Sequence, residues 1–310
     1  MSDLTNPHDK FFKETFSQIE VARDFFANYL PETVTAVIDL DTLALQPDSF
    51  IDIDLQEQFA DLLYSVDLAD GQGAYLYALL EHKSYPDPDT PFQLLRYLVR
   101  IWERDRRNKE PLRPIIPIVV YHGHAKWNIA TNFANLFDGV EALRPYWPAF
   151  HYEIQDLSII NDDEIRGEAQ LQIGMLILKY IFDPQLRVRL GDILSLFNDL
   201  AETTTAVEYL LTVLYYIGSA SKHLEPQDVA ITIQALLDDG GSEIMQTVAD
   251  YWIEQGVEQG VEQGIHQGNV ETARRIALQL LSYHDVIAVS DLTGLSVDEV
   301  QKLDDTREAD

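Results

Sequence analysis

Two carboxylates and one ammonium lie close together in the sequence: Asp61, Glu81 and Lys83. Mg²⁺ takes oxygen ligands, typically one or two carboxylates together with waters and a substrate phosphate. The bound ion lowers the pKa of a water and stabilises charge on phosphoryl oxygens, while a nearby lysine orients that water or neutralises developing charge. These residue types therefore predict phosphoryl chemistry at a Mg²⁺ site. The alternative is an ion-paired sheet edge whose charges discourage aggregation.

A β-hairpin is expected to bring the three residues together. Apolar runs at 62–68 and 74–80 flank an Asp-Gly step, which is a strong hairpin signal. A hairpin centred on the glycine of that step places Asp61 opposite Glu81, to within one residue of register. Lys83 shares the face of Glu81, because alternate residues of a strand point the same way.

The spacing of Asp61 and Glu81-x-Lys83 resembles the PD-(D/E)XK nuclease signature. The surrounding segments resemble the recombination-promoting nuclease family, also called YhgA-like transposases. The segments that carry this resemblance are PHDKFFKETF, VARDFFANYLPE, DLDTLALQPDSFIDIDLQEQFADLLYSV, LLEHKSYPD, PFQLLRYLVRIWER and PIIPIVVYHG. The resemblance covers about residues 7–160, with similar features again at 250–300.

The resemblance implies a PD-(D/E)XK fold and a Mg²⁺-dependent DNA endonuclease, with Mn²⁺ as a substitute ion and no small-molecule cofactor. It implies that Asp61 and Glu81 are metal ligands and that Lys83 is the catalytic lysine. It also suggests a part in recombination or mobile-element biology. Ala60 stands where the signature has proline, a departure of little weight because the chemistry needs the aspartate and not its neighbour.

Two further polar residues are candidates for a supporting role. The related fold often takes an acid from its first helix, here predicted over residues 8–30, and Glu14 is our candidate. Glu20 is an equal rival by position, and a solvated helical glutamate is the alternative. Gln93, near the start of a helix predicted over 92–107, is a candidate for holding the attacking water or a phosphate. Its alternative is an exposed polar residue.

The charge distribution bears on whether DNA is the partner. The net charge is −30, which opposes phosphate binding. Residues 96–113 nevertheless hold seven basic and three acidic residues, a local net charge of +4. We expect Arg96, Arg100 and Arg104 of this strip to contact the DNA backbone. The alternative is that they are arginines that pair with an acidic protein surface.

The element order predicts an α/β fold and three regions. An opening helix, two strands, a helix and two more strands (114–121 and 150–157) match a PD-(D/E)XK core with a mixed central sheet flanked by helices, over residues 1–162. Residues 33–57 are expected to form short helical or extended pieces. Helical periodicity then predicts an all-helical C-terminal region, with a bundle extension over 163–250. Residues 251–310 are expected to hold a Gly-repeat helix and a C-terminal helical hairpin.

Residues 253–269 repeat with a period of four, IEQG-VEQG-VEQG-IHQG-N. On a helix the four glycines form one slowly winding groove, at roughly 1 kcal/mol each relative to alanine. Close approach of a second helix would offset that cost, so this segment predicts a homo-oligomer. A marginal polar helix expanded by repeat slippage is the alternative.

Composition sets the remaining bounds. The chain has 310 residues, is 46% hydrophobic and contains no cysteine, which excludes disulfides and thiolate metal sites. No apolar run reaches the roughly 20 residues that span a membrane, and the N-terminus lacks a signal-peptide pattern, so we expect a cytoplasmic protein. Besides the nuclease, the sequence allows a catalytically weak or inactive nuclease-fold protein that acts as an oligomeric interaction or regulatory module.

Overall fold

The computed structural model of the chain describes residues 6–47, 61–81, 85–200, 203–224 and 226–238, together with 296, 301 and 302. The chain divides into two compact units, Met1–Val248 and Ala249–Asp310. Nearly all described residues belong to the first unit. The predicted Gly-repeat helix at 253–269 lies outside the described residues, as does most of the predicted C-terminal hairpin.

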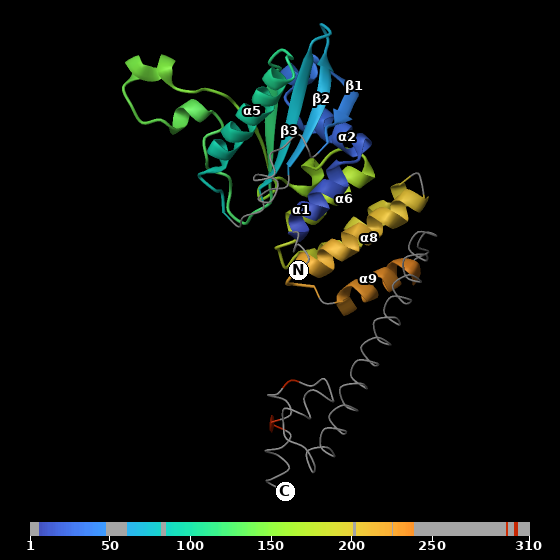
Figure 1. Cartoon of the computed structure of the whole chain (residues 1–310). Helices are drawn as coiled ribbons and strands as arrows, with labels where there is room; N and C mark the ends of the chain where they lie inside the picture. The colour runs from blue at the N-terminus through green and yellow to red at the C-terminus, as the bar shows by residue number, and fades with distance from the viewer. Residues whose placement is uncertain are drawn as a thin grey trace. The chain divides into compact units, whose positions relative to one another are not determined.

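A five-stranded mixed sheet forms the centre of the first unit (Figure 1). Its strands follow the chain order, and they are β1 (Ile38–Leu45), β2 (Asp61–Leu68), β3 (Gly73–Glu81), β4 (Ile115–Tyr121) and β5 (Glu153–Asp156). The first three strands are antiparallel, whereas β3, β4 and β5 are parallel. This confirms the predicted α/β class and mixed sheet, and it adds β1 as a regular strand.

Helices lie before, between and after the strands. The predicted opening helix is two helices, α1 (Pro7–Phe16) and α2 (Ile19–Tyr29), followed by the short α3 (Glu32–Thr35). The crossover helix α5 (Thr90–Arg107) joins β3 to β4 and begins two residues earlier than predicted. The predicted helical region after β5 is confirmed as α6 (Ala169–Tyr180), α7 (Leu186–Ser195), α8 (Thr203–Ala220) and α9 (Pro226–Asp238).

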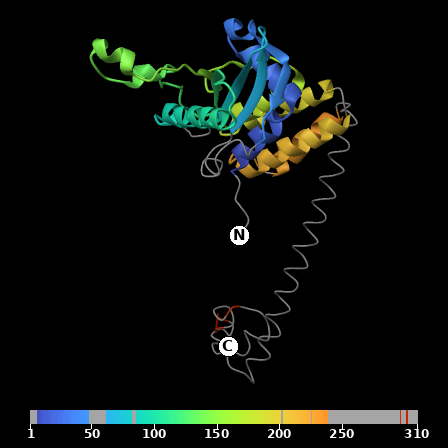
Figure 2. The same cartoon turned by 45° about the horizontal axis from the view of Figure 1, so that its top comes forward.

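Four short 3₁₀ helices complete the described chain. They are η2 (Phe133–Leu136), η3 (Glu141–Tyr146), η4 (Asp162–Glu164) and η5 (Leu196–Asp199). The segment that carries η2 and η3 projects away from the sheet, as Figures 1 and 2 show in green. The helices α6 to α9 fall in the same compact unit as the sheet. The two compact units do not divide at residue 162, so the domain boundary predicted there stays a prediction.

The β2–β3 hairpin is confirmed, but its predicted register is wrong by two residues. Asp61 pairs with Leu79 rather than with Glu81. The backbone N–H of Leu68 donates to the carbonyl of Gln72, which leaves a three-residue loop. Gly71 closes that loop in the left-handed region, at φ 82°. Three-residue hairpin loops commonly end on such a residue, so the hairpin is centred one position earlier than we expected.

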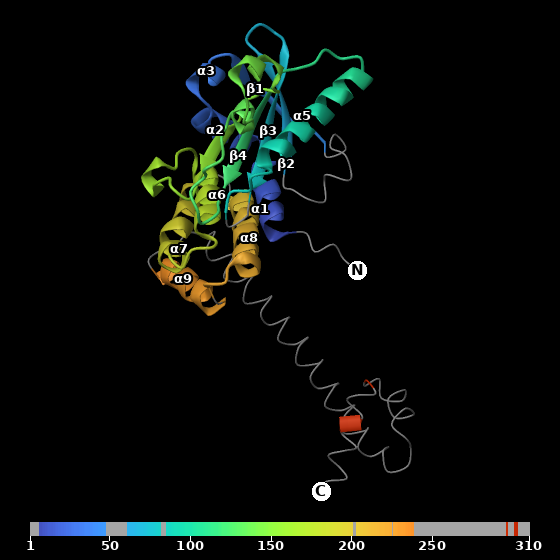
Figure 3. The same cartoon turned by 90° about the vertical axis from the view of Figure 1, so that its left-hand side faces the viewer.

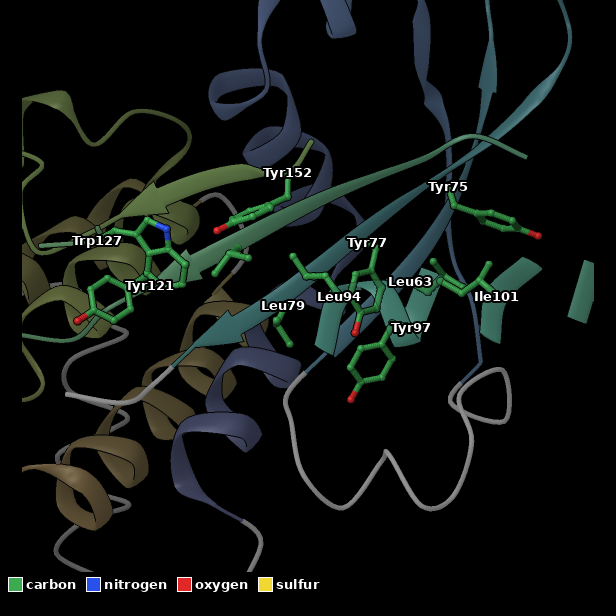
Figure 4. Close-up of a cluster of buried hydrophobic side chains, with 11 residues drawn as sticks. Leu63, Tyr75, Tyr77, Leu79, Leu94, Tyr97, Ile101, Tyr121, Trp127 and Tyr152 are labelled. Atoms are coloured by element: carbon green, nitrogen blue, oxygen red, sulfur yellow. The ribbon is translucent and has the colours of Figure 1, made fainter. Parts of the chain in front are cut away.

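One face of the sheet packs against α5. Its core contains Leu63, Tyr77, Leu79, Val119 and Tyr121 from β2, β3 and β4, and Leu94, Tyr97 and Ile101 from the helix. Figure 4 shows these side chains as one continuous layer that reaches Trp127 and Tyr152 beyond the strands. Asp61 belongs to this face, because it lies two residues before Leu63.

The opposite face is covered by α1 and α2 (Figure 3). The Tyr64 hydroxyl donates to the Phe16 carbonyl of α1 across this face. Further hydroxyl contacts tie α1 to α8, from Thr15 to Tyr209 and from His8 to Tyr216. The C-terminal helices are thus packed directly on the N-terminal helix.

Gly174 of α6 allows this close packing. A Cβ at this position would lie 2.9 Å from both Thr15 and Tyr209, so any larger side chain would displace one of them. Gly218 of α8 offers a matched control, because nothing lies within 4 Å of the corresponding position.

We predict that Gly174→Leu lowers the free energy of unfolding by about 1–3 kcal/mol, the usual cost of overpacking a core. Gly218→Leu should raise it by a few tenths of a kcal/mol, since leucine favours helix over glycine. Denaturant unfolding of both variants measures the difference. Equal effects would show that Gly174 is not a packing constraint.

Candidate active site

Asp61 is a buried carboxylate at the first residue of β2. Only 1% of its surface is exposed, although an ionised group in a protein interior is costly unless it is hydrogen-bonded. The Tyr77 hydroxyl of β3 donates to its Oδ2 at 3.0 Å. Tyr77 pairs with Leu63, so both side chains and Asp61 share the face that packs on α5. The sheet thus supplies a donor that holds this carboxylate in place.

Two tyrosines, Tyr77 and Tyr97, lie near the carboxylate of Asp61. The rings of Tyr77 and Tyr97 lie 5.3 Å apart, and Tyr97 comes from α5. Burial raises the pKa of both phenols, and the charge of Asp61 raises the pKa of each further. Both therefore remain protonated donors at neutral pH. The sequence analysis missed both tyrosines. Tyr77 could have been found because it shares the strand parity of Glu81, and Tyr97 because it lies one helical turn after Gln93.

Glu81 is the last residue of β3, and its backbone pairs with Tyr121 of β4. Because Asp61 pairs with Leu79, Glu81 is its diagonal neighbour on the same face, at about 7–8 Å between Cα atoms. The two-residue error in register therefore preserves the shared face. The structure describes only the backbone of Glu81, and Lys83 lies outside the described residues.

Gln93 faces the sheet from the first turn of α5. In a β–α–β crossover the helix runs back along the sheet, so this turn lies near the carboxyl end of β3. Gln93 is only 5% exposed, which contradicts the alternative of an exposed polar residue. No donor within the described part of the chain reaches its buried Oε1. Such an acceptor costs about 1–3 kcal/mol unless it receives a hydrogen bond.

Glu14 lies elsewhere. It is exposed on α1 and forms a surface ion pair with Lys10, at 3.8 Å. Its rival Glu20 is exposed on α2. Both helices cover the sheet face opposite to Asp61, so the structure does not bring either acid to the site. This arrangement matches the alternative of a solvated helical glutamate, and a catalytic role for Glu14 remains only a prediction.

The three arginines of α5 differ in their surroundings. Arg96 and Arg100 are exposed, and Arg100 also pairs with Glu103 at 3.1 Å. Arg104 is partly buried and donates to the Tyr75 hydroxyl at 3.2 Å. Burial lowers the pKa of Arg104. Arg96 and Arg100 are therefore better placed than Arg104 to meet a phosphate.

Carboxylate oxygens such as those of Asp61 are the ligands that Mg²⁺ prefers. Among the described residues, no group of three or more His, Cys, Asp or Glu side chains could hold a metal ion. Mg²⁺, however, is commonly held by one or two carboxylates, with waters and substrate completing its shell. The buried carboxylate of Asp61, on the same face as Glu81, fits that requirement.

Residues 6–208 match the family model described as "Putative transposase, YhgA-like". The chain belongs to this family. The recombination-promoting nuclease RpnC of Escherichia coli K12 is a relative, 31% identical over 96% of this chain and 98% of its own length.

Other relatives differ in the activity that their names record. The recombination-promoting nuclease RpnA of E. coli K12 is 28% identical over 82% of this chain and 91% of its own length. The inactive recombination-promoting nuclease-like protein RpnE of the same strain is 32% identical over 68% of this chain and 72% of its own. No solved structure matches the chain. None of the described helices combines the length and apolarity required to cross a membrane.

The hydrogen bond from Tyr77 to Asp61 makes a prediction about stability. Tyr77→Phe should lower the free energy of unfolding at pH 7 by about 1.5–3 kcal/mol, the range for hydrogen bonds to charged groups. Tyr85→Phe is the control, because Tyr85 is 64% exposed. Denaturant unfolding tests both variants, and equal effects would contradict a structural role for this bond.

The raised pKa of Tyr77 also makes a prediction about stability at high pH. The folded pKa of Tyr77 is raised, so above pH 10 only the unfolded chain releases this proton and stability falls. The loss is up to about 1.4 kcal/mol per pH unit for each such tyrosine. Tyr77→Phe should therefore lose stability less steeply between pH 10 and 11 than the unaltered chain does.

Proposed function

We propose that this chain is a metal-dependent DNA endonuclease with a PD-(D/E)XK core. The observation that carries the proposal is the buried Asp61, which Tyr77 holds on the same sheet face as Glu81. The order of elements supports it, since three antiparallel strands, a crossover helix and a parallel strand follow the opening helices. Two relatives that are named as nucleases, RpnC and RpnA, support it as well.

Each site residue has a distinct task in this proposal. Asp61 and Glu81 would hold Mg²⁺, or Mn²⁺ in its place. Bound there, the ion would lower the pKa of a water and stabilise charge on the phosphoryl oxygens. Lys83 neutralises the charge that develops on the phosphate. The buried Oε1 of Gln93 accepts a hydrogen bond from the attacking water and so fixes its direction of approach.

DNA is the proposed substrate, and exposed arginines contact its backbone. Arg96 and Arg100 lie four residues apart on α5, the helix whose first turn carries Gln93. They belong to the strip with a local net charge of +4, while the whole chain carries −30. Binding should therefore be weak and strongly salt-dependent, since few phosphates are neutralised.

A second candidate function is an oligomeric interaction or regulatory module without cleavage activity. The name of RpnE, which records an inactive relative, favours it, and so does the charge of −30. Self-association through residues 253–269 would be its basis. Proteins of this second kind need no intact metal site, whereas this chain keeps Asp61, Glu81 and Lys83.

Plasmid nicking with Mg²⁺ or Mn²⁺ distinguishes the two functions. We predict that the unaltered chain nicks the plasmid, that EDTA stops it, and that Asp61→Asn lowers the rate at least about 100-fold. Asp67→Asn is the matched control, because Asp67 is an exposed aspartate on the same face of the same strand, and its variant should cut normally.

Two outcomes would contradict the nuclease proposal. Equal rates in Asp61→Asn and Asp67→Asn would remove Asp61 from the chemistry. A folded, unaltered chain that gives no metal-dependent cleavage would favour the interaction module. Circular dichroism of each variant separates a loss of activity from a loss of fold.

A further inference from the structure

A cavity of about 630 Å³ lies at the end of β5, within the described part of the chain. This volume is within the usual range of small-ligand sites, about 300–1,000 Å³. Six of the residues that line it are Lys126, Trp127, Ile154, Ile159, Ile160 and Glu164. Nothing in the proposed cleavage reaction uses these side chains, so the cavity needs an explanation of its own.

The cavity adjoins the candidate active site along one edge of the sheet. Glu81, Tyr121 and Asp156 are the last residues of three parallel strands, and they pair in one row. Neighbouring strands lie about 4.8 Å apart, so the backbone of Asp156 is roughly 10 Å from that of Glu81. The carboxyl ends of parallel strands are where open α/β sheets bind ligands.

One aromatic contact connects this row to the cavity. The rings of Tyr121 and Trp127 meet at 5.2 Å, and Figure 4 shows both at the end of the aromatic layer that begins at Tyr75. Tyr121 pairs with Glu81, and Trp127 lines the cavity. The contact between Tyr121 and Trp127 therefore connects the strand position of Glu81 to the cavity.

The walls of the cavity are suited to a flat apolar surface. Ile154, Ile159 and Ile160 line it, and the Ile159 side chain is 54% exposed, so a ligand can reach it. The side-chain amides of Gln155 and Asn161 also line it and offer both donors and acceptors. A ligand with apolar faces and a polar edge would satisfy both kinds of surface.

The charges in the cavity disfavour a phosphate in its interior. Asp156 accepts the backbone N–H groups of Trp127 and Ser158, at 2.8 and 3.0 Å, so its carboxylate is fixed in place. Glu164 caps Asn161 in the same way, at 2.9 Å. Two carboxylates and one exposed lysine, Lys126, line the cavity, so the net charge of the lining is negative and disfavours an anion. An uncharged group suits this lining together with its apolar side chains.

We propose that this cavity binds the base of an unpaired nucleotide next to the scissile phosphodiester. The proposal rests on the nuclease function proposed above and specifies its substrate. A base has flat apolar faces and a hydrogen-bonding edge, but in a duplex those surfaces are stacked and paired. Only an unpaired nucleotide presents them. Because a chain with charge −30 gains little from phosphates, contact with a base supplies much of the affinity.

The test compares two single-stranded oligodeoxynucleotides with the same number of phosphates, one of them abasic throughout. Binding to the full-length chain is measured by fluorescence anisotropy in EDTA, which keeps the strands intact. We predict roughly ten-fold tighter binding of the base-bearing strand, the contribution of about one base contact. Ile159→Asp should abolish that preference, because it places a further carboxylate on the exposed wall of the cavity.

Ile231→Asp is the matched control, since Ile231 is 67% exposed on α9, and it should keep the preference. Ile159→Ala provides a milder change that should reduce the preference without adding charge. Equal binding of the two strands by the unaltered chain would overturn the proposal, and so would a preference that survives both Ile159 variants. This readout does not depend on cleavage, so it can fail while plasmid nicking succeeds, and the reverse.

Discussion

The fold must keep an ionisable carboxylate buried at the start of β2, and much of the site follows from that constraint. Asp61 is nearly inaccessible to solvent, so protein groups must replace the water that it gives up. The Tyr77 hydroxyl does part of this, and Tyr77 is itself kept protonated by burial beside Tyr97. The carboxylate, the two phenols and the packing of α5 on the sheet therefore depend on one another.

The candidate site and the helices that pack against the C-terminal helices lie on opposite faces of the sheet. Asp61 and Gln93 belong to the face that α5 covers, and Glu81 occupies a strand position of the parity expected for that face, whereas α1 and α2 cover the other face and carry the C-terminal helices. The close approach at Gly174 and the hydroxyl contacts between α1 and α8 hold that second layer. Because β3, β4 and β5 are parallel, their carboxyl ends meet along one edge, where the cavity beside Trp127 continues the row that begins at Glu81.

Local sequence signals predicted the hairpin, the crossover helix, the buried strand β4 and the C-terminal helices, because each has strong periodicity or turn chemistry. The register of the hairpin was wrong because the sequence does not determine which three residues form the loop: the prediction centred the loop on Gly71, whereas the loop is residues 69–71 and ends on Gly71. The parity of the strand positions of Asp61 and Glu81 is unchanged, since an error of two residues preserves parity. Residues 33–57 were predicted only as short helical or extended pieces, because the pairing of β1 with β2 shifts between Asp39 and Ala44 and disrupts the alternation of buried side chains.

The candidate residues named from the sequence are those that lie close together along the chain, whereas the tyrosines that tertiary packing brings near Asp61 were missed. Asp61 and Glu81 lie on one hairpin, but Tyr97 reaches Asp61 only after α5 folds across the sheet. Whether Gln93 is buried likewise depends on that packing. Glu14 and Glu20 could not be told apart by position, because the sequence did not show that they belong to two helices on the sheet face opposite to Asp61.

The central claim is that Asp61 binds a catalytic metal ion, and Mn²⁺ binding measured by electron paramagnetic resonance tests it without DNA or turnover. The account predicts that the tightest class of Mn²⁺ sites is present in the unaltered chain and in Asp67→Asn, and is lost in Asp61→Asn. Weak binding to the acidic surface should be the same in all three. Identical binding curves for Asp61→Asn and Asp67→Asn would contradict the account.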